Sequence, residues 1–167
     1  MLLIRKEDLD LLVDHLRTEL PHEGCGILGG RGDRALKVYR MSNTEQSPVR
    51  YCMDSGELAE AILDMHQNCL DIVGIYHSHL HDSAYPSSRD LQLAYYPDAL
   101  YVIVSLADPP RPQIRGFRIG DGQVHEEDIV QEERDVLFKR GELPVLSEPE
   151  QGRSGLAMRR QEQEETG

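Results

Sequence analysis

The sequence predicts an α+β fold in which helices pack on one mixed sheet. Two stretches, Leu9 to Leu20 and Leu58 to Cys69, carry apolar residues at offsets of three and four, which is typical of amphipathic helices. Apolar or alternating runs typical of strands lie before, between and after these helices. Short turn sequences join the later runs and favour hairpin connections. Together these patterns predict a three-layer arrangement.

The first half of the chain predicts a strand, a helix and a hairpin. Leu2 to Arg5 can form a short strand, and the helix that follows is ended by Pro21-His22. Residues 23–30 are expected to form a glycine-rich strand, with residues 35–41 as its antiparallel partner. The small residues of the first strand suggest that another backbone or an extended substrate approaches it closely.

The second half predicts a helix followed by strands around one polar loop. Asp54 or Ser55 can cap the helix, whose apolar stripe includes Ile62 and Cys69. The remaining expected elements are a buried strand from Asp71 to His79, a short helix beginning at Arg89 and Asp90, a buried strand at Ala99–Leu106, and a hairpin of Ile114–Ile119 with Val124–Val130.

Size and charge limit the function. With 167 residues the chain has room for one domain with a sizeable core. Its 30 acidic and 18 basic residues give a formal charge of −12, which argues against nucleic acid or an anionic membrane as a partner. We expect the domain to occupy residues 1–130. Residues 131–147 are expected to form an extension that can dock on the domain, and the Glu- and Gln-rich residues 148–167 a flexible tail.

The cysteines and the N-terminus predict a cytoplasmic protein. Cys25, Cys52 and Cys69 are odd in number and have no CxxC spacing, so we expect reduced thiols. The N-terminal residues do not resemble a signal peptide, and no segment has the twenty or so apolar residues that span a bilayer.

A candidate metal site lies at the end of the strand at residues 71–79. His77 and His79 are two residues apart, so on a strand their side chains leave the same face and can bind one ion. Asp90, after a polar loop, is the expected third ligand. Two histidines and one carboxylate suit zinc, and three protein ligands leave a fourth position for water, as in catalytic sites. Spacing alone also permits His81 as a ligand. His15 is expected to be a solvated residue on the polar face of the first helix.

These residues carry a family resemblance. The chain has Glu23-Gly24-Cys25-Gly26-Ile27-Leu28-Gly29-Gly30, then Gly74-Ile75-Tyr76-His77-Ser78-His79, then ten residues and Asp90 with Ser87 three positions before it, and finally Val102-Ile103-Val104-Ser105-Leu106. In this order the motifs resemble the JAMM (MPN-plus) zinc metalloproteases, over roughly residues 1–130. The resemblance implies a curved, largely antiparallel sheet flanked by helices, like the cytidine deaminase fold.

The resemblance also assigns roles. His77, His79 and Asp90 would hold one zinc ion, which excludes His81. Glu23 would be the general base, and Ser87 would donate a hydrogen bond to the oxyanion, although a helix cap is an equally good interpretation of this serine. Ser78 is expected to tie the loop through its hydroxyl.

The implied function is a prokaryotic, single-domain zinc peptidase or isopeptidase. Its substrate would be the bond after the C-terminal Gly-Gly of a ubiquitin-like or sulfur-carrier protein, including a carrier–cysteine conjugate. Two alternatives stay open: a non-catalytic MPN module that only binds or scaffolds partners, and a metal-dependent hydrolase of small amides.

Overall fold

The structure, a computed structural model, describes residues 1–132. The predicted docked extension and flexible tail therefore lie outside the described residues, except that residues 131 and 132 belong to the last strand. The helices are α1 (Lys6–Thr18), α2 (Ser55–Gln67) and α3 (Ser88–Gln92). The strands are β1 (Leu2–Arg5), β2 (Cys25–Arg31), β3 (Arg34–Met41), β4 (Asp71–His79), β5 (Leu100–Ser105), β6 (Gln113–Gly120), β7 (Gln123–Glu127) and β8 (Ile129–Glu132).

The strands form one mixed sheet in the order β7-β6-β5-β4-β2-β3-β1-β8. β2 runs antiparallel to both β3 and β4, and β5, β6 and β7 continue from β4 with one parallel and two antiparallel pairings. β1 is parallel to β3 and to β8. The predicted mixed sheet with flanking helices is confirmed.

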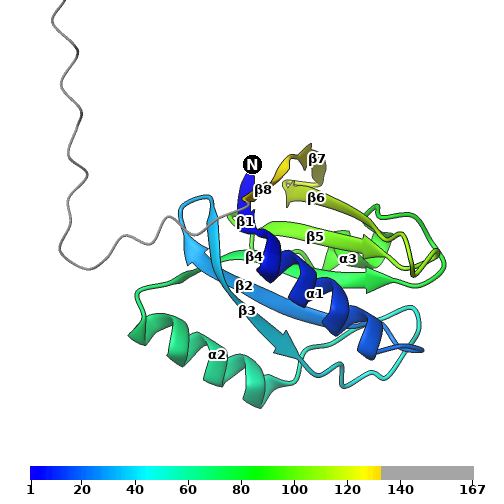
Figure 1. Ribbon diagram of the computed structural model, residues 1–167, viewed down its shortest axis with the longest axis horizontal. Coiled ribbons are helices and arrows are strands. Elements are labelled where there is room, and N and C mark those ends of the chain that lie inside the picture. Colours follow the sequence, from blue (N-terminus) through cyan, green and yellow to red (C-terminus); the bar gives the residue numbers. More distant parts are fainter. Residues whose placement is uncertain (133–167) are drawn as a thin grey trace, which may run out of the picture. The chain divides into compact units, whose positions relative to one another are not determined.

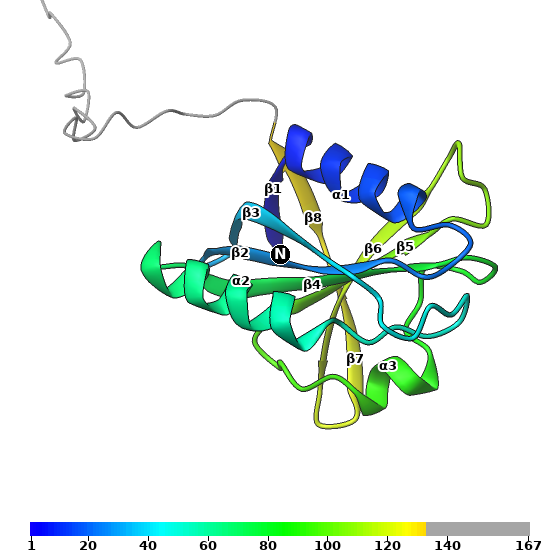
Figure 2. The ribbon, with the colours of Figure 1, turned by 90° about the horizontal axis from the view of Figure 1, so that it is seen from below.

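The expected last strand, Val124–Val130, is instead two strands. The break is at Asp128: β7 before it pairs with β6, whereas β8 after it pairs with β1 at the other end of the strand order. One residue thus joins the two outermost strands. The sheet must curve strongly to allow this, and Figure 2 shows β7 and β8 as one nearly continuous run crossing the other strands.

Helices cover both faces of the sheet. α1 lies on one face, and α2 and α3 lie on the other (Figures 1 and 2). Side chains of β4 alternate between the faces. Tyr76 packs in the cluster that includes residues of α1, whereas Ile75 packs in a cluster on the opposite face. His77 and His79 share the parity of Ile75, which places both imidazoles on the face that carries α3.

His15 does not behave as expected from the sequence. It is 7% exposed, and its Nδ1 lies 2.9 Å from the hydroxyl of Tyr76, whose ring crosses the interior between α1 and β4. Gly26 of β2 makes room for this ring, because a Cβ at Gly26 would lie 2.3 Å from Tyr76 Cζ. The same Cβ would lie 2.4 Å from the backbone carbonyl oxygen of Tyr39, so the expected close approach of another backbone is found at Gly26. The prediction of a solvated His15 was wrong because a buried hydroxyl satisfies its nitrogen.

The second helix is shorter than its apolar stripe suggested. Asp54 caps it by accepting from the backbone nitrogens of Gly56 and Glu57, as predicted. It ends at Gln67, so Cys69 falls in the following turn with a positive φ and is exposed. Ile62 is also exposed, whereas Met65 is buried in the core.

Candidate active site

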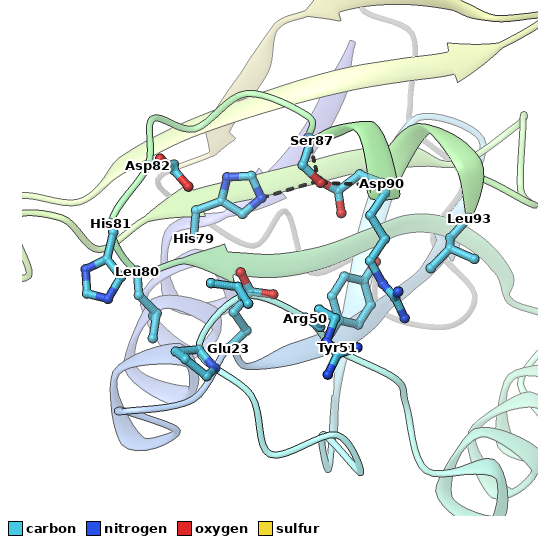
Figure 3. A pocket seen from close by; sticks show the side chains of 13 residues that line it. Glu23, Arg50, Tyr51, His79, Leu80, His81, Asp82, Ser87, Asp90 and Leu93 are labelled. Carbon is cyan, nitrogen blue, oxygen red and sulfur yellow. Dashed lines mark hydrogen bonds and ion pairs between the residues drawn. The ribbon is translucent and has the colours of Figure 1, made fainter.

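The three predicted metal ligands converge. One donor atom from each of His77, His79 and Asp90 lies within 4.8 Å of the others. The two imidazole Nε2 atoms are 3.1 Å apart, His77 Nε2 lies 3.3 Å from Asp90 Oδ1, and His79 Nε2 lies 3.4 Å from Asp90 Oδ2. The ion pair of His79 and Asp90 is drawn in Figure 3. Within the described residues, no other group of three such side chains meets this arrangement.

This donor set fits a tetrahedral metal ion. Ligand atoms around zinc with bonds of about 2.0–2.1 Å lie about 3.3 Å from one another. The three separations between donor atoms match that edge length. Two imidazole nitrogens that face each other need a proton or a cation between them, since both lone pairs are acceptors. The residues present therefore fit the zinc ion that the sequence predicted.

Asp90 is held in place by the start of α3. Its carboxylate accepts from the backbone nitrogen of Ser87 at 2.6 Å, and its own backbone nitrogen donates to Ser87 Oγ at 3.2 Å, which forms a capping box. Burial opposes the charged form of Asp90. Contacts with His77 and His79 outweigh burial and hold the pKa of the carboxyl well below its usual range. The cap interpretation of Ser87 is thus confirmed, and its proposed role toward an oxyanion stays a prediction.

The histidines differ in their second nitrogens. His79 Nδ1 lies 3.0 Å from the carbonyl oxygen of Ser83, which favours a proton on Nδ1 and a free lone pair on Nε2. His77 Nδ1 is buried and has no hydrogen-bond partner within residues 1–132. The ring of Tyr51 instead stacks on the His77 ring, with centroids 4.6 Å apart. Packing, more than hydrogen bonding, orients His77.

Glu23 faces the same pocket from between α1 and β2. Its backbone is fixed by two hydrogen bonds of 2.8 Å, from its nitrogen to the Ser47 carbonyl and from Asn43 Nδ2 to its own carbonyl. The side chain is 6% exposed, and its carboxylate points toward the part of the pocket that holds His79 and Asp90 (Figure 3). Burial raises the pKa of Glu23 to about 7. A carboxyl with this pKa can accept and release a proton near neutrality.

Ser78 has the structural role that the sequence indicated, whereas the exclusion of His81 as a ligand stays a prediction. Ser78 Oγ accepts from the backbone nitrogen of Gly24 at 2.9 Å, so this serine ties the segment that carries Glu23 to β4. His81 is exposed at the rim of the pocket and does not belong to the group of three donors.

Burial raises the pKa of the Cys25 thiol to about 12, so this cysteine is unreactive, and all three cysteines are free.

The pocket has a volume of about 60 Å³. Its lining includes residues that the sequence did not single out: Tyr51, Arg50 and Arg89 (Figure 3 labels the first two). Arg50 and Tyr51 belong to the loop between β3 and α2. No spacing in the sequence connects this loop to β4, so only tertiary folding brings Tyr51 onto His77.

Comparison with protein families identifies the fold family. The family model described as prokaryotic homologs of the JAB domain matches residues 5–119. This chain belongs to that family. The CysO-cysteine peptidase of Mycobacterium tuberculosis is 43% identical to it over 131 residues, which cover 77% of this chain and 90% of the relative. A probable TtuB-protein conjugate cleaving protease of Thermus thermophilus is 33% identical over 110 residues, 65% of this chain and 70% of that protein.

Solved structures agree with the family. A protein of Desulfitobacterium hafniense, solved in solution, has a TM-score of 0.73 at 38% identity, covering 80% of this chain and 94% of that one. A structure described as a JAMM metalloprotease-like zinc site has a TM-score of 0.53, covering 80% of this chain and 99% of that one; at 16% identity it shows the fold alone. The chain is a hydrolase of the JAB/JAMM family. No helix in residues 1–132 is long and apolar enough to cross a membrane.

Proposed function

We propose that this chain is a zinc-dependent peptidase that hydrolyses the bond after the C-terminal Gly-Gly of a ubiquitin-like or sulfur-carrier protein, with a carrier–cysteine conjugate as its preferred substrate. One observation carries the proposal: the donor atoms of His77, His79 and Asp90 lie within 4.8 Å of one another in the pocket that Glu23 also lines. A module that only binds partners has no need of a buried carboxylate beside an open ligand set.

The relatives support the choice of substrate. The mycobacterial protein is named for a CysO–cysteine substrate and the Thermus protein for a TtuB–protein conjugate. A desampylase of Pyrococcus furiosus is 41% identical over a shorter stretch of 70 residues. The mycobacterial enzyme matches the largest share of this chain among these three, so we favour release of a single cysteine. We infer that the reaction takes place in the cytoplasm, where thiols stay reduced.

A zinc ion bound by His77, His79 and Asp90 would polarise the scissile carbonyl and make water a nucleophile at neutral pH. When the oxygen of the water molecule bonds to the carbonyl carbon, Glu23 accepts the proton that the water loses. The same carboxyl then gives that proton to the nitrogen when the C–N bond breaks. Its burial suits both steps, because a pKa near 7 permits transfer in either direction.

Ser87 can act as cap and donor at once. The cap uses Ser87 Oγ as an acceptor from the Asp90 nitrogen, so the hydroxyl proton remains available to a substrate oxygen. Ser87 lines the pocket, as an oxyanion donor must. Its removal should lower kcat by about 10²–10³-fold, the usual effect of losing one such donor.

The test uses purified protein, the CysO–cysteine conjugate that gives the mycobacterial relative its name, and the same carrier joined to a lysine side chain. Mass spectrometry of the products should show release of free cysteine. Metal analysis should show about one zinc per chain. If the protein is a non-catalytic scaffold, the conjugates should stay intact and the protein should contain little zinc. A hydrolase of small amides predicts zinc and cleavage of short amides, but intact carrier conjugates.

A further inference from the structure

Two arginines line the pocket beside the candidate catalytic residues. Arg89 comes from α3, one residue before the proposed ligand Asp90, and Arg50 comes from the loop that also carries Tyr51. Both arginines are exposed to solvent, so a ligand can reach them. They are notable because the chain is acidic, with a formal charge of −12.

Arg89 has no carboxylate partner. Its side chain forms no hydrogen bond or ion pair within the described part of the chain, and both Asp90 oxygens are directed to His77, His79 and the Ser87 nitrogen. Arginines elsewhere on the surface do pair, for example Arg115 with Glu126 at 2.6 Å. Among residues 1–132, the Arg50 side chain has one ion-pair contact, a long one of 3.5 Å with Glu45. Arg89 is therefore free to bind a carboxylate from outside the chain.

The chemistry of the substrate places such a carboxylate in this pocket. When the leaving group is a single amino acid, its carboxylate carbon is two bonds, about 2.5 Å, from the scissile nitrogen. Any group that recognises it must line the pocket where that nitrogen receives its proton. A lysine side chain in an isopeptide bond has no carboxylate at this distance. Arginine is the residue best suited to this task, since its planar fork can hold both oxygens.

We propose that Arg89 binds the free carboxylate of the leaving amino acid, with Arg50 in a supporting role, and that this contact makes the site selective for releasing one C-terminal residue over cleaving an isopeptide bond. This inference rests on the proposed peptidase function and deepens it. The rival explanation is that the two arginines only offset the negative charge of Glu23, Asp82 and Asp90.

The experiment compares two substrates that differ in one group: carrier–cysteine with a free carboxylate and carrier–cysteinamide. The native protein should cleave the acid with a kcat/KM about tenfold to a hundredfold higher than the amide, as expected for a charge-assisted hydrogen bond. Arg89→Gln should lose that preference by slowing cleavage of the acid alone. Arg50→Gln should reduce the preference less. Arg34→Gln, which removes an exposed arginine at the opposite end of the β2–β3 pairing from His77, is the matched control and should change neither rate.

Binding gives a second readout that does not depend on turnover. In Glu23→Gln protein, which should bind without cleaving, calorimetry should show tighter binding of the acid than of the amide. Adding Arg89→Gln should remove the difference, while zinc content stays near one per chain.

The outcomes separate the two proposals. If the native protein cleaves acid and amide equally, or if Arg89→Gln slows both substrates to the same degree, carboxylate recognition by Arg89 is refuted and the peptidase function stands. If Arg50→Gln alone removes the preference, the assignment to Arg89 is refuted. If the native, zinc-loaded protein cleaves neither conjugate, the peptidase function itself fails.

Discussion

Acid should destabilise this protein through His15. The side chain is buried between α1 and β4, with the Tyr76 hydroxyl at Nδ1 and Glu19 at 3.6 Å from Nε2. Burial is the largest cause that lowers the pKa of His15, Arg40 adds to it and Glu57 opposes it, and together they bring the pKa to about 4. The folded protein therefore holds a neutral imidazole at pH values where the unfolded chain binds a proton.

The size of the effect follows from the two pKa values. Between the ordinary value of 6.5 and about 4, the unfolded state carries one more proton than the folded state, so stability falls as pH decreases through this window. The contribution is fully present above pH 6.5. By pH 5 about 2 kcal/mol of the free energy of unfolding is lost, and by pH 4 about 3 kcal/mol.

Urea unfolding at pH 7.5 and at pH 5 measures this loss, with His15→Gln as the comparison. The glutamine does not titrate, so its variant should lose about 2 kcal/mol less than the native protein over the same interval. Metal loss from protonated ligands affects both proteins and cancels in the difference. Parallel losses in the two proteins would refute a buried neutral His15.

Five further substitutions, two of them controls, test the site and the packing that supports it. Glu23→Gln should keep zinc near one per chain while hydrolysis falls by orders of magnitude, because only the proton acceptor is removed; loss of zinc would contradict this role. Asp90→Ala should lose the metal, whereas His81→Ala should keep both metal and activity, as metal analysis and the conjugate assay can show. Gly26→Ala should lower the free energy of unfolding by about 1–3 kcal/mol or more, since its Cβ has no room. Gly120→Ala, where the nearest atom is 3.9 Å away, is the control for thermal denaturation.

Local pattern was enough to predict the ligand strand. The parity of His77 and His79 depends only on the two-residue period of a strand, and the structure places both rings on one face. Asp90 was predicted from its place after the polar loop, and the family motif supported the same residue, but nothing in the loop itself fixes how far the chain returns toward the histidines. The capping box explains how Asp90 is positioned beside the histidines, since Ser87, the N-cap of α3, holds the Asp90 side chain.

Other features depend on contacts between distant parts of the chain and could not be predicted. A histidine on a helix looks solvated until the Tyr76 hydroxyl, 61 residues away, is placed beside it. The break at Asp128 has a similar origin, because no glycine or proline marks it in the sequence and only the pairing partners change. Tyr51 and Arg89 carry no motif. Their place in the pocket follows from the loop and helix that bring them there.

The parallel pairing of β8 with β1 makes the first strand of the chain one of the last to be completed. During synthesis on a ribosome, Leu2 to Arg5 emerge well before their partners at Ile129 to Glu132, which form the last of the described strands. Until then one edge of β1 offers unpaired amides to any neighbouring chain. Nascent chains that stop short of Ile129 should therefore associate with one another, or with chaperones, far more than chains that reach Glu132.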